Sequence, residues 1–172
     1  MPDAEGTRQA EFRPEAILAA LNARGVRYVL IGGFAAVIHG SPYVTIDLDV
    51  VPEASPANLE RLSDALRDLD ARVWTDGVPD GLQFAHNAES LSRADLWNLV
   101  TDSGRLDIRF RPSGTAGFSD LARDAVHLTI LGAGVEVASL ADVIRSKEAA
   151  GREKDRLVLP VLRRIMDRGG RR

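Results

Sequence analysis

Two aspartates, Asp47 and Asp49, alternate with apolar residues in the segment 46–51. Acidic residues are poor strand formers, so a pair of them in an apolar strand needs an explanation. Residues i and i+2 of a strand point to the same face with Cα atoms about 6.5–7 Å apart, so the two carboxylates would repel each other. A divalent cation would remove that repulsion, and Mg²⁺ prefers hard oxygen ligands together with phosphate. The spacing therefore predicts a site for Mg²⁺ or Mn²⁺.

A third acidic residue, Asp107, lies in the segment 106–110, where apolar and charged residues also alternate. If this strand neighbours the first one, Asp107 could complete a cluster of three carboxylates. Such a cluster can hold two metal ions about 3.5–4 Å apart, the arrangement that serves in-line phosphoryl and nucleotidyl transfer. We therefore predict Asp47, Asp49 and Asp107 as metal ligands and catalytic residues, with Asp107 as the general base.

A glycine pair, Gly32 and Gly33, precedes an expected short helix at 34–39. Backbone N–H groups at a glycine turn and a helix N-terminus bind anions. Beside a metal cluster, this site would suit the β- and γ-phosphates of a nucleoside triphosphate (NTP). Ser41 and Thr45, in the turn before the first aspartate, are weighed as further nucleotide ligands against a simpler role in capping that turn.

Charge is distributed unevenly along the chain, although its net value is only −3 over 172 residues. From Arg145 onward there are ten Lys or Arg and four Asp or Glu, so this end carries +6 and the remainder −9. The only two lysines, Lys147 and Lys154, both lie in this basic end. Such a split indicates contact with a polyanion such as RNA, or else a solvated helix face and tail.

The order of helix and strand signals predicts an α/β (α+β) fold, with a mixed sheet, flanking helices and a short C-terminal helical appendage. Pro160 is expected to kink the last helix or to mark a misplaced boundary. The expected helices are 14–24, 34–39, 56–70, 118–125, 139–150 and 153–167; the expected strands are 27–32, 46–52, 71–75, 96–101, 105–111, 127–131 and 135–138; residues 76–94 are expected to be an irregular loop.

The expected organisation is a disordered N-terminus (1–12), a core (13–138), C-terminal helices packed on the core (139–168) and a basic tail (169–172). There is no cysteine, which excludes disulfides and thiolate chemistry. The first residues are polar and acidic, unlike a signal peptide, and no apolar run approaches the length of about 20 residues that spans a membrane. These features predict a cytoplasmic protein without a membrane partner.

The stretch from Ile31 to Val50, Ile-Gly-Gly-Phe-Ala-Ala-Val-Ile-His-Gly-Ser-Pro…Thr-Ile-Asp-Leu-Asp-Val, resembles the nucleotidyltransferase fold of the DNA polymerase beta superfamily. It is most similar to small prokaryotic members, the stand-alone nucleotidyltransferases and the AbiEii-like toxins of toxin–antitoxin pairs. The later segment 146–155 resembles the Lys…Arg-x-Lys-Asp segment of that group, which implies active-site roles for Lys147 and Asp155. Tyr43 stands where many relatives carry an arginine.

The leading functional hypothesis is transfer of NMP from an NTP to an acceptor hydroxyl, with Mg²⁺ or Mn²⁺ as cofactor. The acceptor would be an RNA 3′ end, such as that of tRNA, or a protein, and the resemblance implies a toxin role with a cognate antitoxin as one specific form. A second hypothesis is a non-catalytic partner module with the same fold. A third is nucleotidylation of an antibiotic, for which an acidic cleft from residues 76–100 would provide support.

Overall fold

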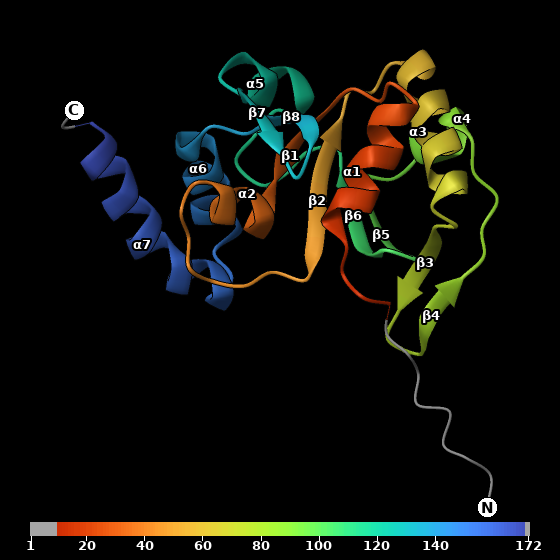
Figure 1. The fold of residues 1–172 in the computed structure, drawn as a ribbon, viewed down its shortest axis with the longest axis horizontal. Helices are drawn as coiled ribbons and strands as arrows, with labels where there is room; N and C mark the ends of the chain where they lie inside the picture. The colour runs from red at the N-terminus through yellow and green to blue at the C-terminus, as the bar shows by residue number, and fades with distance from the viewer. Residues whose placement is uncertain (1–9, 171–172) are drawn as a thin grey trace, which may run out of the picture.

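The computed structural model describes residues 10–170, within which helices and strands alternate around one mixed sheet (Figure 1). The strand order is β4-β3-β5-β6-β2-β1-β8-β7. The helices are α1 (Pro14–Ala23), α2 (Gly32–Ile38), α3 (Pro56–Asp68), α4 (Ala88–Leu91), α5 (Phe118–Arg123), α6 (Leu140–Ala150) and α7 (Glu153–Gly169). The strands are β1 (Tyr28–Ile31), β2 (Asp47–Pro52), β3 (Arg72–Thr75), β4 (Val78–Leu82), β5 (Leu96–Thr101), β6 (Gly104–Arg109), β7 (Val126–Ile130) and β8 (Ala133–Val137).

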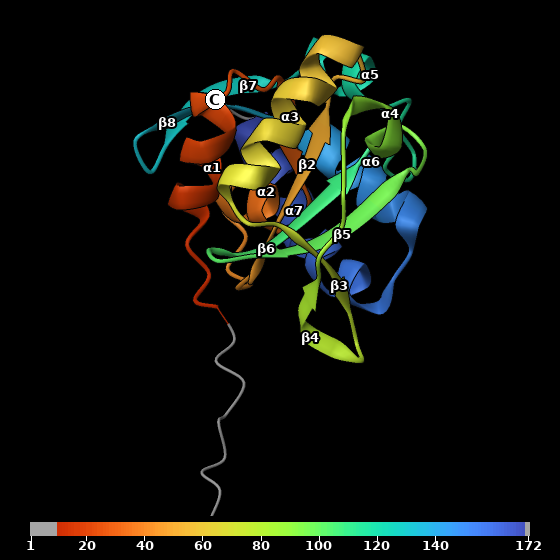
Figure 2. The ribbon, with the colours of Figure 1, turned by 90° about the vertical axis from the view of Figure 1, so that its right-hand side faces the viewer.

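Helices cover the sheet from two sides. Helices α1, α3 and α4 lie on one side and α2, α6 and α7 on the other, and the view turned by 90° has α1 and α3 in front of the sheet (Figures 1 and 2). The leucines of α1 and α3 are fully buried, as are Leu48 of β2 and Leu106 of β6. Because strand residues alternate between faces, burial of these leucines turns the aspartates of β2 and β6 to the opposite side of the sheet.

The central strands place the three aspartates side by side. β2 pairs with β1 in antiparallel fashion, and it pairs with β6 in parallel with Asp49 directly opposite Asp107. The strand that carries Asp107 therefore does neighbour the strand that carries Asp47 and Asp49. The two expected hairpins, β5–β6 and β7–β8, also form, and the α/β fold class predicted from the sequence is confirmed.

The expectation of an irregular loop at 76–94 is wrong for two short elements, β4 and α4. Pro79 and Gly81 obscured β4 because both residues weaken a strand. β4 pairs only with β3 and forms the edge of the sheet, where the missing N–H of a proline is tolerated. At α4, the side chain of Asn87 accepts a hydrogen bond from the Ser90 backbone and forms a capping box, a signal that the sequence reading overlooked.

Pro160 lies inside α7, which continues to Gly169, so the proline does not mark a helix boundary. Residues 1–9 of the expected disordered N-terminus and Arg171–Arg172 of the expected tail lie outside the described part of the chain. Within that part, Phe12 packs edge-on against Phe34 with ring centroids 6.2 Å apart. Among residues 10–170, none of the helices combines the length and the apolar character that crossing a membrane requires.

Candidate active site

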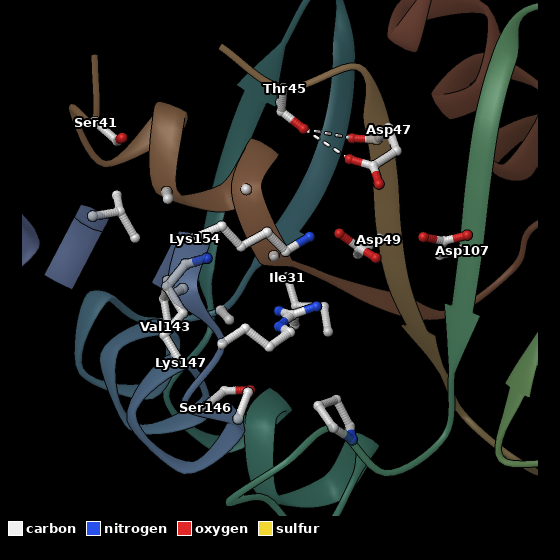
Figure 3. Close-up of a pocket in the computed structure, with 18 of the residues that line it drawn as sticks. Ile31, Ser41, Thr45, Asp47, Asp49, Asp107, Val143, Ser146, Lys147 and Lys154 are labelled. Atoms are coloured by element: carbon white, nitrogen blue, oxygen red, sulfur yellow. Dashed lines mark hydrogen bonds between the residues drawn. The ribbon is translucent and has the colours of Figure 1, made fainter. Parts of the chain in front are cut away.

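Three carboxylates converge at the centre of the sheet. Asp47 and Asp49 project from β2 and Asp107 from the adjacent β6, and each offers an oxygen within 4.8 Å of those of the others (Figure 3). Asp49 is 8% exposed and Asp107 only 4% exposed. The structure thus brings together the three residues that the sequence selected as metal ligands, although their roles stay predictions.

Burial disfavours the ionised form of these carboxylates when no cation is bound. It raises the pKa of Asp107 to about 7, with further contributions from the negative charges of Asp49 and Asp47. Burial and the charge of Asp47 also raise the pKa of Asp49, although Arg109 and Lys154 oppose that rise. One buried oxygen of Asp107, Oδ1, has no hydrogen-bond partner among the described residues. Arg105 Nη2 lies 3.8 Å from this oxygen and forms an ion pair with it but no hydrogen bond. An oxygen-rich cluster with a buried oxygen that accepts no hydrogen bond fits a hard divalent cation.

The glycine pair leaves room for the cluster. Gly32 has φ +74°, and a Cβ atom at this position would lie 2.2 Å from Asp49 Oδ2. A side chain there would meet both a left-handed backbone and a steric clash. At Gly33 the corresponding Cβ would lie 3.2 Å from Thr45 Oγ1. The first glycine is therefore required for the close approach of α2 to β2, independently of any contact with phosphate.

The turn before β2 orients the first aspartate. The Thr45 hydroxyl donates a hydrogen bond of 2.9 Å to Asp47 Oδ1, whereas the Ser41 hydroxyl accepts one of 3.3 Å from the Tyr43 backbone N–H. Both side chains line the same pocket as the carboxylates. Their observed bonds support the simpler role in organising the turn, and contact with a nucleotide stays a prediction for both.

A pocket of about 550 Å³ opens beside the carboxylates. Its walls come from the start of α2, the 41–46 turn, the loop after β6, and the facing sides of α6 and α7. Exposed apolar side chains, among them Tyr43 and Leu157, form part of its lining. In the described part of the chain, no residue of 76–100 lines the pocket, so this segment does not supply the acidic cleft considered for a cationic acceptor.

The C-terminal residues that the resemblance singled out, Lys147 and Asp155, form an ion pair, and their role at the active site stays a prediction. Asp155 is fully buried and does not line the pocket; it accepts hydrogen bonds from Arg152 Nε at 2.7 Å and Lys147 Nζ at 3.3 Å. Burial alone would raise the pKa of Asp155, but Arg152 and Lys147 outweigh burial and lower it. Lys147 does line the pocket but is only 9% exposed. Asp155 is thus placed to hold the α6–α7 junction together.

Two cations near the carboxylates, Arg109 and Lys154, were not among the site residues that the sequence analysis selected. Arg109 Nε is 3.5 Å from Asp49 Oδ1, and Lys154 extends from α7 towards Asp49 (Figure 3). The signals were present in the sequence: Arg109 shares a strand face with Asp107, and Lys154 is one of only two lysines. Neither signal distinguishes a residue that faces the site from one that faces solvent.

In comparisons with known proteins, no family model matches the chain, and no curated protein matches it in sequence. Several solved structures are similar in fold, among them the following two. The lincosamide antibiotic adenylyltransferase LnuA, bound to lincomycin, has a TM-score of 0.61 at 15% identity, covering 91% of this chain and 99% of LnuA. TM1012 from Thermotoga maritima, described as a candidate nucleotidyltransferase, has a TM-score of 0.53 at 15% identity, covering 94% of this chain and 99% of its own. The chain therefore has the nucleotidyltransferase fold.

Proposed function

We propose that the protein is a metal-dependent nucleotidyltransferase that moves NMP from an NTP to an acceptor hydroxyl. The observation that carries this proposal is the cluster of three carboxylates, two of them buried, at the wall of a pocket that Gly32 and Gly33 also line. A purely structural role would not favour three repelling acids without a full set of partners. The similarity in fold to LnuA and TM1012 supports the same reaction class.

In the proposed reaction, the acceptor oxygen forms a bond to the α-phosphorus, and the bond from that phosphorus to its bridging oxygen breaks. Pyrophosphate leaves, and Asp107 takes the proton of the acceptor hydroxyl. Mg²⁺ or Mn²⁺ held by Asp47, Asp49 and Asp107 would neutralise the charge that develops on the phosphate oxygens. Burial raises the pKa of Asp107 to about 7 in the metal-free protein, and a bound divalent cation would lower this pKa again, so Asp107 would be ionised and able to accept a proton at neutral pH.

A basic surface on α7 supports an RNA acceptor. Arg156, Arg164 and Arg168 are exposed on this helix, and none has an ion-pair partner within residues 10–170. The first two turns of α7 form a wall of the pocket, so a polyanion bound along the helix could place a terminal hydroxyl near the carboxylates. RNA, such as tRNA, is therefore our leading acceptor, and action as a toxin restrained by an antitoxin is the narrower form of this proposal.

A small molecule is the second candidate acceptor. It is favoured by the similarity in fold to LnuA, whose name gives a lincosamide antibiotic as its substrate and 99% of whose length aligns with this chain. The exposed apolar side chains of Tyr43 and Leu157 at the pocket could contact such a molecule. The two candidates differ in one respect that can be measured, because only the RNA reaction should weaken steeply with added salt.

The test is incubation with each α-labelled NTP and Mg²⁺, together with total tRNA, a protein extract, or a panel of lincosamides and aminoglycosides. We expect labelled RNA and release of pyrophosphate. Asp49→Asn should abolish the transfer while the fold persists, and Asp80→Asn, at an exposed position on β4, serves as the matched control. Full activity of the Asp49 variant would overturn the mechanism. Absence of Mg–NTP binding at millimolar nucleotide would favour the non-catalytic module.

A further inference from the structure

A row of side chains crosses the sheet from the carboxylates towards the β4 edge. Asp49 of β2 lies opposite Asp107 of β6, and Asp107 lies opposite Asn98 of β5. Continuing the register of β3 against β5 places Trp74 beside Asn98. Residues that lie opposite one another share a face, so all four side chains point to the active-site face. Neighbouring strands are about 4.8 Å apart, which puts the backbone of Trp74 about 10 Å from that of Asp107.

Arg105 connects Trp74 with Asp107. The guanidinium carbon of Arg105 lies 3.9 Å from the centroid of the Trp74 ring, and its Nη2 lies 3.8 Å from Asp107 Oδ1. Arg105 Nε is buried and has no hydrogen-bond partner among residues 10–170. An indole ring and a guanidinium group are both planar, and nucleobases stack on both. The pair therefore forms a stacking surface next to the proposed general base.

This part of the active-site face is open to solvent. On the opposite face of the same strands, Leu99 and Leu106 are fully buried. On the active-site face, Asn98 and Trp74 are only half-buried and Leu96 of β5 is 40% exposed. The hairpin of β3 and β4 extends beyond the helices (Figure 2). Some RNA-binding domains stack bases on aromatic side chains of an open sheet, and Trp74 occupies such a position.

The proposed reaction directs the acceptor to this side of the carboxylates. In an in-line displacement, the attacking and leaving oxygens lie on opposite sides of the phosphorus. Gly32 and Gly33 begin α2 on the β1 side of the cluster, where the departing phosphates would bind. Asp107, which would take the proton of the acceptor, lies on the other side, and the next strand beyond it is β5. The body of the acceptor would therefore extend over β5 towards Trp74.

We propose that the 3′-terminal base of the RNA acceptor stacks on the surface formed by Trp74 and Arg105, above Asn98. This inference rests on the proposed function and adds the subsite that selects the acceptor. A terminal nucleotide can span the distance from Asp107 to Trp74, so its hydroxyl would reach the carboxylates while its base stacks. Every base has a π face, so the surface selects an unpaired end instead of a particular sequence.

The chain has two tryptophans, Trp74 and Trp97, and this allows a direct test. Trp97 faces the other side of the sheet, where its ring stacks on Phe84 with centroids 5.6 Å apart and its indole N–H donates to the Leu91 carbonyl. In Trp97→Phe, we expect single-stranded oligoadenylate to quench the fluorescence of Trp74. In Trp74→Phe, the same titration should leave the fluorescence of Trp97 unchanged. Transfer of NMP to oligoadenylate without quenching of Trp74 would overturn the assignment.

Kinetics test the contribution of stacking to transfer. Trp74→Ala should raise KM for the RNA acceptor about 5- to 150-fold, the range of one base stacked on an aromatic side chain, and leave KM for the NTP unchanged. Trp74→Tyr keeps an aromatic ring and should restore most of the affinity. Trp97→Phe is the matched control and should keep wild-type values, and thermal unfolding verifies that each variant is folded.

The outcomes separate this inference from the proposed function. Unchanged KM for RNA in Trp74→Ala, or an equal rise in KM for the NTP, would overturn the stacking subsite alone. Failure of Trp74→Tyr to restore RNA affinity would also overturn it. A wild-type protein that binds Mg–NTP but transfers NMP to no RNA would overturn the RNA reaction itself.

Discussion

Replacing Asp107 with asparagine is expected to stabilise the metal-free protein while abolishing nucleotidyl transfer. The carboxyl is 4% exposed and faces two other carboxylates, and burial together with these charges raises its pKa from 3.8 to about 7. A group whose pKa is raised in the folded state is favoured when protonated. The protonated carboxyl of Asp107 therefore stabilises the fold fully only below pH 3.8, and this stabilisation is lost as the pH rises towards 7.

The size of the effect follows from the shift. At about 1.4 kcal/mol per pH unit, ionisation of Asp107 costs the folded state about 2 kcal/mol at pH 5 and about 4 kcal/mol at pH 8, as upper limits. An asparagine is never charged, so the stability gap between the variant and wild type should widen by roughly 2–3 kcal/mol between these pH values. For a chain of this length, 1 kcal/mol shifts Tm by about 2–4 °C.

The assay is urea and thermal unfolding in EDTA at pH 5 and pH 8, with Asp80→Asn as an exposed control. Added Mg²⁺ should raise the Tm of wild type and have much less effect on the Asp107 variant, because ligand binding stabilises only the protein that binds it. A variant that is less stable than wild type at pH 8 in EDTA would refute the view that the carboxylates repel one another in the fold. A gap independent of pH would refute the role of ionisation.

Further substitutions test how the cluster is held. Gly32→Ala should lower nucleotidyl transfer and Mn²⁺ affinity by at least about tenfold, because the new Cβ would lie 2.2 Å from Asp49 Oδ2. Wild-type values in this variant would show that the protein relieves the clash without cost. Thr45→Val removes a 2.9 Å hydrogen bond to Asp47 and should weaken Mn²⁺ binding roughly tenfold. Thr45→Ser keeps a hydroxyl and should retain Mn²⁺ binding. Equal losses in both variants would point to packing instead of the hydrogen bond. Asp155→Asn removes the charge of a fully buried carboxylate that pairs with Lys147 and with the exposed Arg152. It should cost about 3 kcal/mol in urea unfolding, with an unchanged midpoint as the contrary result.

Several local features of the fold were predictable because they depend on neighbours in sequence. The serine caps of α3 and α6, at Ser55 and Ser139, form as their sequence patterns indicate. The edge strand β4 was not predictable, since Pro79 and Gly81 disfavour a strand locally. Its pairing with β3 is a tertiary contact that overrides the local preference.

For the active site, the sequence by itself determined which residues can do chemistry. The alternation of Asp47 and Asp49 with apolar residues fixes both carboxylates on one face of a strand, because the strand period is 2. Only the tertiary structure decided that β6 lies beside β2 and sets Asp107 opposite Asp49, since strand order depends on contacts between distant segments. It also decided the different surroundings of Lys147 and Lys154: the first is buried and pairs with Asp155, whereas the second is exposed at the pocket.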